Sequence, residues 1–237
     1  MQKNLIRSCK LLIFTGIFFV VILGFAMMAY PGGSYNDRAS IHYNFFENFL
    51  SDLGATMTIS GKQNTVSNIL FITALGSVGI VLIYFSKIWR AMGTEVHRMS
   101  VIGYLSKFSL ILSGLSFIGI AFTPWNKYFE YHVMFVKSAF CFLLAWTLLI
   151  IILQAGNPKM RNLMVSNILY SIILGIYVYF LYNGPKAGTE EGNTFQAIAQ
   201  KIIFVVSVAN LITQAMGIKR FLRFADFRKG GVKNFYV

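Results

Sequence analysis

The stretch Leu11–Tyr30, LLIFTGIFFVVILGFAMMAY, contains about 20 consecutive residues without a charged side chain. An α-helix of about 20 residues crosses a bilayer core of about 30 Å. Similar stretches recur along the chain, and they lack the strict alternation of membrane β-strands, so helices are expected. The expected spans are about Leu11–Tyr30, Val66–Ser86, Val101–Thr123, His132–Gln154, Leu163–Tyr182 and Ala197–Ile218.

Composition agrees with a membrane protein. The 237 residues are 56% hydrophobic and only 12% charged, which is too apolar for an ordinary soluble domain. Six spans leave no room for a soluble catalytic domain, and short loops force neighbouring helices to run antiparallel. We therefore expect an all-α fold, a six-helix transmembrane bundle that forms a single domain over residues 1–237.

The net charge of +13 taken alone is compatible with nucleic-acid binding, but the positions of the basic residues exclude that interpretation. Of the 21 Lys and Arg residues, fourteen lie on the side of the N-terminus, four lie opposite, and three lie within spans. By the positive-inside rule, we expect a multi-pass cell-membrane protein with both termini cytoplasmic, membrane lipids as partners and no nucleic acid. The sequence does not predict an oligomeric state.

The long first loop, Pro31–Thr65, has a helical pattern of its own. Between Ile41 and Leu53, apolar residues recur at four-residue intervals beside polar ones, which predicts a short amphipathic helix. Gly54 follows as an expected C-terminal stop. Such a helix would lie along the outer interface or fold over the mouth of the bundle.

Two spans carry polar or small residues on one face. Amides are costly against lipid, so the sixth span is expected to turn its polar stripe toward protein or a wet cavity. Both interhelical hydrogen bonding and ligand binding remain open for that stripe. The residues of the sixth-span stripe are Gln196, Gln200, Ser207, Asn210, Gln214 and Gly217. The small residues of the third span are Gly103, Ser106, Ser109, Ser113, Ser116, Gly119 and Thr123, a pattern that favours close helix packing.

Asp52 belongs to the densest polar group of the loop, and two lysines lie near the same end of the bundle. Lys137 is close to the outer end of the fourth span, and Lys201 is close to that of the sixth. Each lysine either extends its ammonium to the headgroups or takes part in a site. In such a site Asp52 would pair with one lysine, or the lysines would hold a lipid phosphate. The predicted ligand-binding residues are Asp52, Lys137, Lys201, Gln200, Asn210 and Gln214.

The sequence contains fewer residues that indicate catalysis than residues that indicate ligand binding. Ser51, Asp52 and His132 are candidates for a hydrolase, because a serine needs a base and the base needs an orienting group. No nucleophile elbow, phosphate-binding glycine loop or dinucleotide motif accompanies them, so no cofactor is expected. A metal site is not expected either, although His42 and His132, with one carboxylate, are the candidate ligands.

The segment Asn48–Gly54, NFLSDLG, followed by a polar spacer and a span, resembles the Frag/DRAM/Sfk family and its uncharacterised prokaryotic cousins. Gly119–Pro124, GIAFTP, followed by His132, is similar to the prokaryotic group. The resemblance implies a six-span membrane protein. It also implies lipid handling, since eukaryotic relatives are linked to autophagy, GPI-anchor lipid remodelling and phosphoinositide regulation.

Taken together, these patterns favour a non-enzymatic protein that binds or senses lipid headgroups in the outer leaflet. One alternative is a membrane-embedded lipid-modifying hydrolase. The other is a small-solute or proton-coupled transporter, for which no inverted repeat is evident.

Overall fold

The computed structural model describes residues 2–93, 100–186 and 188–224. Within these residues, two short 3-10 helices accompany the α-helices: η1 (Leu50–Gly54) lies in the first loop, and η3 (Pro158–Met160) precedes α6. The α-helices are α1 (Gln2–Ala29), α2 (Thr65–Phe85), α3 (Lys87–Gly93), α4 (Ser100–Phe122), α5 (Phe129–Ala155), α6 (Arg161–Asn183) and α7 (Glu190–Phe224).

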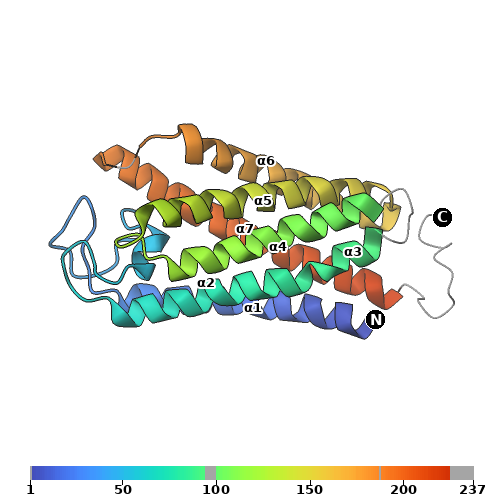
Figure 1. Cartoon of the computed structure of the whole chain (residues 1–237), viewed down its shortest axis with the longest axis horizontal. Coiled ribbons are helices and arrows are strands. Elements are labelled where there is room, and N and C mark those ends of the chain that lie inside the picture. Colours follow the sequence, from blue (N-terminus) through green and yellow to red (C-terminus); the bar gives the residue numbers. More distant parts are fainter. Residues whose placement is uncertain (1, 94–99, 187, 225–237) are drawn as a thin grey trace.

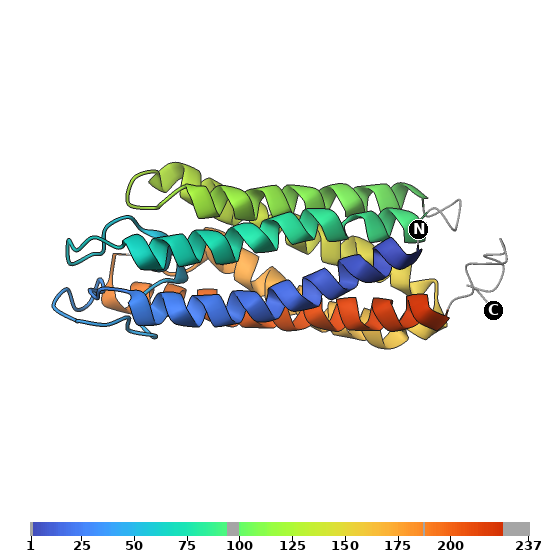
Figure 2. The same cartoon turned by 90° about the horizontal axis from the view of Figure 1, so that it is seen from below.

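Six of these helical segments are long and apolar enough to cross a membrane, which confirms the expected six-helix bundle. Each long helix packs on the next one along the chain, from α1 through α2, α4, α5 and α6 to α7, and α7 packs again on α1. The bundle is therefore a closed ring of antiparallel neighbours (Figures 1 and 2). The connections that follow α2 are short, and they leave each later helix only a position beside the preceding one.

The bundle has two distinct ends. The loop end carries residues 30–64, which connect α1 to α2, and the terminal end is where α1 begins and α7 ends (Figures 1 and 2). At the terminal end the Gln2 side-chain amide donates a hydrogen bond to the carbonyl of Leu222, which joins α1 to α7.

Aromatic side chains fill the interior. Trp89 and Trp146 are fully buried, and their ring centroids lie 5.7 Å apart in an edge arrangement. Nearer the loop end, Phe140 of α5 makes edge contacts with Phe204 of α7 at 5.7 Å and with Tyr177 of α6 at 4.8 Å. Edge contacts of this kind stabilise a packed core beyond simple burial.

Two glycines permit a close backbone approach between the helices α2 and α4. A Cβ on Gly79 would lie 2.5 Å from the carbonyl oxygen of Gly114, and a Cβ on Gly114 would lie 2.7 Å from that of Gly79. The neighbouring Ser113 donates a hydrogen bond of 3.0 Å to the carbonyl of Ala139 on α5. The small-residue face of the third span thus packs on protein, as expected, and Gly114 extends it.

The first loop differs from its predicted form. The expected amphipathic helix over Ile41–Leu53 is wrong in extent, because regular structure begins only at Leu50, in the 3-10 helix η1. Upstream of η1, the Asn48 side chain accepts a hydrogen bond of 2.9 Å from the backbone N–H of Asn44 and so stabilises a turn. Side-chain bonds of this type compete with a continuous helix.

Candidate functional site

A group of polar side chains, four of them buried and two half-buried, joins the first loop to α7 at the loop end, and we call it the loop cluster. It consists of Tyr43, Asn48, Asp52, Asn64, Gln200 and Lys201.

Asn48 is the centre of the loop cluster, and it is fully buried. Its amide nitrogen donates to the carbonyl of Gly33 at 2.9 Å and to Oδ2 of Asp52 at 3.0 Å. Its backbone carbonyl accepts from the hydroxyl of Tyr43 at 3.2 Å and from the ammonium of Lys201 at 2.5 Å. One residue therefore connects two parts of the loop to α7.

Gly33 can take this place because its backbone is left-handed, with φ at +92°. A side chain there would also lie 2.7 Å from the backbone nitrogen of Ser60. Glycine populates this conformation without the steric cost that other residues meet. The tight turn directs the Gly33 carbonyl to Asn48 and to the hydroxyl of Tyr30.

Asp52 lies in η1 and is 1% exposed. Its Oδ2 accepts from Asn48 and also from the backbone N–H of Phe49, at 2.9 Å. Burial raises the pKa of this carboxyl to about 6, against the opposing effects of these two hydrogen bonds and of the Lys201 charge. The indole N–H of Trp125 also lowers this pKa, although it makes no hydrogen bond of ordinary geometry with any described residue.

Asn64 attaches η1 to the start of α2. Its amide nitrogen donates to the carbonyls of Asp52, Leu53 and Ala55, at 3.3, 3.1 and 2.9 Å. Gly54 does not adopt the left-handed conformation of a helix stop. Instead, a Cβ at Gly54 would lie 2.4 Å from the ring of Phe71, so this position requires glycine for close packing on α2.

Lys201 and Gln200 extend from α7 to the loop. The Lys201 ammonium donates to the carbonyls of Asn48 and Ala197, the second at 3.1 Å, and the residue is 5% exposed. Gln200 accepts from the backbone N–H of Leu50 at 2.8 Å. The expected approach of Asp52 to Lys201 is present as an electrostatic coupling through Asn48, without a direct ion pair.

Lys137 is not part of the loop cluster. Its ammonium lies 4.6 Å from the ring centroid of Tyr182 on α6, a cation–π contact. The hydroxyl of Tyr182 in turn lies 3.6 Å from Sγ of Cys141, one turn along α5 from Lys137. The two lysines predicted for one site therefore contact different partners.

The catalytic candidates are not joined by hydrogen bonds in the described chain. Nδ1 of His132 pairs with the carbonyl of Thr123 at 2.7 Å, whereas Asp52 is bonded to Asn48 and Phe49. Within the part of the chain that the structure describes, the Ser51 side chain makes no hydrogen bond to either residue. Among the described residues, no three His, Cys, Asp or Glu side chains form a group able to hold a metal ion, so His42 and His132 have no third ligand there.

The predicted stripe on α7 faces protein, which confirms its expected direction. Two of its residues, Asn210 and Gln214, belong to an amide chain, a continuous series of side-chain hydrogen bonds across α5, α6 and α7 in the half of the bundle nearer the terminal end. Each amide donates to the next along the chain, and the last donates to the carbonyl of Leu163. In order of donation, its members are Ser166, Asn210, Asn167, Gln154 and Gln214, with donor–acceptor distances of 2.8–3.1 Å.

The amide chain contains no group that titrates near neutral pH, because its members are four carboxamides and one serine hydroxyl. Asn210 and Gln214, predicted as ligand residues, use their side-chain oxygens and nitrogens within protein. Ser166 was not predicted from the sequence, and neither were two amides of the chain, Gln154 and Asn167. An amide inside an otherwise apolar span was the signal that identified the α7 stripe, and it applies equally to these two residues.

No protein-family model, curated protein or solved structure matches this chain. The class of protein that the fold defines is thus a multi-pass membrane protein built as a closed six-helix ring.

Proposed function

We propose that this multi-pass membrane protein binds the phosphate of lipid headgroups at the loop end, through the ammonium of Lys201. The supporting observation is an unused hydrogen-bond donor. An ammonium has three N–H donors, and two of those on Lys201 go to the carbonyls of Asn48 and Ala197. A phosphate oxygen on the third donor would form a charge-assisted hydrogen bond.

The charge of Lys201 supports the same proposal. Among the described residues, no carboxylate lies within salt-bridge distance of this ammonium, and Asp52 acts on it only from farther away. A buried cation without a direct counter-ion is costly, above all in a membrane protein. A lipid phosphate would supply the missing charge.

Phe45 provides a route of access. Its ring centroid lies 5.2 Å from the Lys201 ammonium, yet the residue is 51% exposed. The Tyr43 ring lies 5.6 Å from the same ammonium, and because Phe45 belongs to the loop, its ring can move without movement of a helix. Phe46 is also exposed, with its ring centroid 5.5 Å from that of Phe45, and apolar side chains there are suited to contact lipid.

Replacing Lys201 with methionine tests this function. We expect Lys201→Met to weaken binding of dioleoyl phosphatidic acid about tenfold or more, since hydrogen bonds to charged groups contribute about 1.5–3 kcal/mol. Binding of dioleoylglycerol, which has the same chains and no phosphate, should not change. Titration of each lipid against purified protein, followed by native mass spectrometry, measures both affinities.

Lys62→Met is the matched control, because Lys62 is an exposed lysine at the same end. It should bind both lipids as the wild type does. If Lys201→Met melts at a lower temperature but binds phosphatidic acid normally, Lys201 only fastens the loop, and the proposed function is wrong.

The proposal includes an orientation, in which the loop end faces the outside of the cell membrane and both termini face the cytoplasm. The supporting observation is the excess of Lys and Arg at the terminal end. The resemblance of Asn48–Gly54 to Frag/DRAM/Sfk proteins also belongs to the proposal, because that segment contributes Asn48 and Asp52 to the loop cluster.

Cysteine labelling of intact cells checks the orientation. Lys127 at the loop end and Lys159 at the terminal end are both exposed, so Lys127→Cys and Lys159→Cys form a matched pair. With Cys9 and Cys141 replaced by alanine, a membrane-impermeant maleimide should label position 127 and spare position 159 until the cells are opened. Labelling of position 159 alone would show that the orientation is the opposite of the one proposed.

A further inference from the structure

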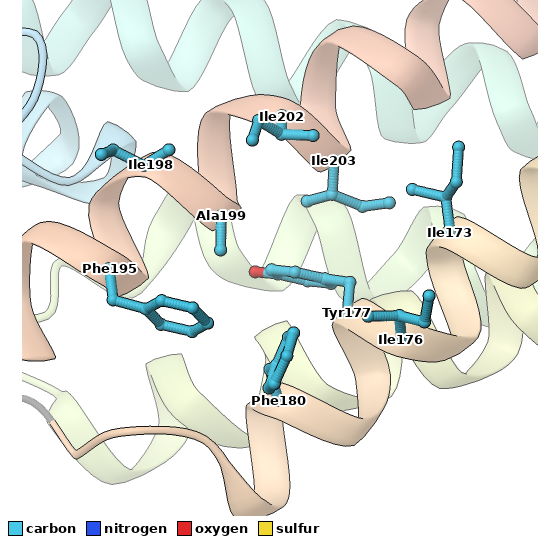
Figure 3. Close-up of a pocket in the computed structure, with 9 residues that line it drawn as sticks. All are labelled: Ile173, Ile176, Tyr177, Phe180, Phe195, Ile198, Ala199, Ile202 and Ile203. Carbon is cyan, nitrogen blue, oxygen red and sulfur yellow. The ribbon is translucent and has the colours of Figure 1, made fainter.

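We infer that a pocket between α6 and α7 binds one acyl chain of a glycerolipid, whose ester carbonyl accepts a hydrogen bond from the hydroxyl of Tyr177. The pocket lies in the half of the bundle nearer the loop end and contains no residue of the loop cluster (Figure 3). Its occupancy and the phosphate binding proposed for Lys201 can therefore fail separately.

The shape and lining of the pocket suit an acyl chain. Its volume is about 280 Å³, close to the lower end of the range for small-molecule pockets, about 300 Å³. This space holds a chain segment rather than a whole lipid. The lining is almost entirely apolar, with Ile173, Ile176 and Phe180 from α6, and Phe195, Ile198 and Ile202 from α7.

Tyr177 carries the polar part of the inference. The residue is 5% exposed, and no described residue forms a hydrogen bond with its hydroxyl. By contrast, the hydroxyl of Tyr170, two turns earlier on α6, pairs with Ser207 at 2.8 Å. A buried hydroxyl normally has a partner, so the Tyr177 hydroxyl requires one from outside the protein.

The direction of that hydroxyl is set by packing. The Tyr177 ring makes an edge contact with Phe140, at 4.8 Å between centroids. Figure 3 shows the hydroxyl directed away from α6, toward α7 on the side of Ala199. A donor held in an apolar pocket of a membrane helix pair selects a ligand that combines a hydrocarbon chain with one acceptor. An acyl ester has that combination, and membrane lipid supplies it at the exposed faces of Ile176 and Ile202.

The position of Tyr177 along α6 agrees with an ester group as its partner. Tyr177 lies six residues before the end of α6 at Asn183, or about 9 Å along the axis. The ester groups of a glycerolipid lie at the boundary of the hydrocarbon core, so an ester carbonyl there would be within reach of a tyrosine hydroxyl near the end of the helix. The chain below it would then extend along Ile176 and Ile173 toward the middle of the bundle.

Photo-crosslinking of protein in nanodiscs tests the inference, with a phosphatidylcholine that carries a diazirine in one acyl chain as the probe. Mass spectrometric mapping should place the crosslinks mainly on pocket residues of α6 and α7. Tyr177→Phe should lower the yield there about fivefold, the effect of one lost hydrogen bond. Ala199→Phe should abolish it by filling the space.

Each variant has a matched control outside the pocket. Tyr179 is exposed on α6, so Tyr179→Phe should leave the yield unchanged, and the same holds for Val205→Phe, at a 66% exposed position of α7. Crosslinks spread evenly over all exposed apolar side chains would overturn the inference in favour of annular lipid. Crosslinks between two protein copies at the pocket would overturn it in favour of a self-association surface. If Ala199→Phe does not fold, Tyr177→Phe and its control still decide the result.

Discussion

Gly79→Ala is expected to destabilise the bundle by about 3 kcal/mol, at the upper end of the usual cost of overpacking. The reason is a backbone contact: the new Cβ would lie 2.5 Å from the carbonyl oxygen of Gly114 and 2.7 Å from Cγ1 of Ile118. A carbonyl oxygen in a helix cannot rotate away as a side chain can, so α2 and α4 must separate. Thermal unfolding in detergent, followed by circular dichroism, measures the change.

Gly76→Ala is the matched control, one turn earlier on α2. A Cβ at Gly76 would meet no atom within 4 Å. Alanine there should be neutral, or stabilising by up to about 1 kcal/mol, because it is the better helix former. Equal melting temperatures for the two variants would mean that α2 and α4 are not in backbone contact at Gly79.

Asn167→Leu is the second substitution for which we expect a large effect, about 3 kcal/mol of lost stability. The Asn167 amide nitrogen donates to Oε1 of Gln154 at 2.9 Å, and its oxygen accepts from Asn210 at 3.0 Å. Leucine is similar in size but offers neither group, so two buried amides lose a partner at once. Leaving such groups unsatisfied costs about 1–3 kcal/mol each.

Asn183→Leu provides the comparison for this variant. Asn183 lies at the exposed end of the same helix, and its amide donates only to the carbonyl of Tyr179, at 3.4 Å. Its replacement should change the melting temperature little. If Asn167→Leu is as stable as Asn183→Leu, the amide chain is not structural, and a role of the α7 stripe in solute passage becomes the better explanation.

The six spans were predictable because the bilayer imposes one length on every spanning helix. The inward direction of Ser207, Asn210 and Gln214 was predictable for a related reason: an amide facing lipid has no partner, so helical spacing alone indicates which face is buried. Both predictions depend only on the local sequence and on the lipid that surrounds each helix. Neither requires knowledge of which helices are neighbours.

The loop was predicted less well, because its conformation depends on partners that are distant in the sequence. The four-residue spacing from Ile41 to Leu53 predicted a helix, but bonds from Asn48 to Gly33 and Lys201 favour turns there. Likewise, hydropathy could not distinguish Lys137 from Lys201. Only the packing of α7 against the loop brings Lys201 near Asp52, whereas α6 presents the Tyr182 ring to Lys137.

The sequence by itself therefore determined the number of spans, their alternation and the buried face of the sixth, since these follow from the free energy of each segment in lipid. The tertiary structure alone decided the contact of Gly79 with Gly114, the amide chain through Gln154 and Asn167, and the hydrogen bond from Lys201 to Asn48. Each of these contacts joins segments far apart in the chain, and its geometry exists only once the helices have packed.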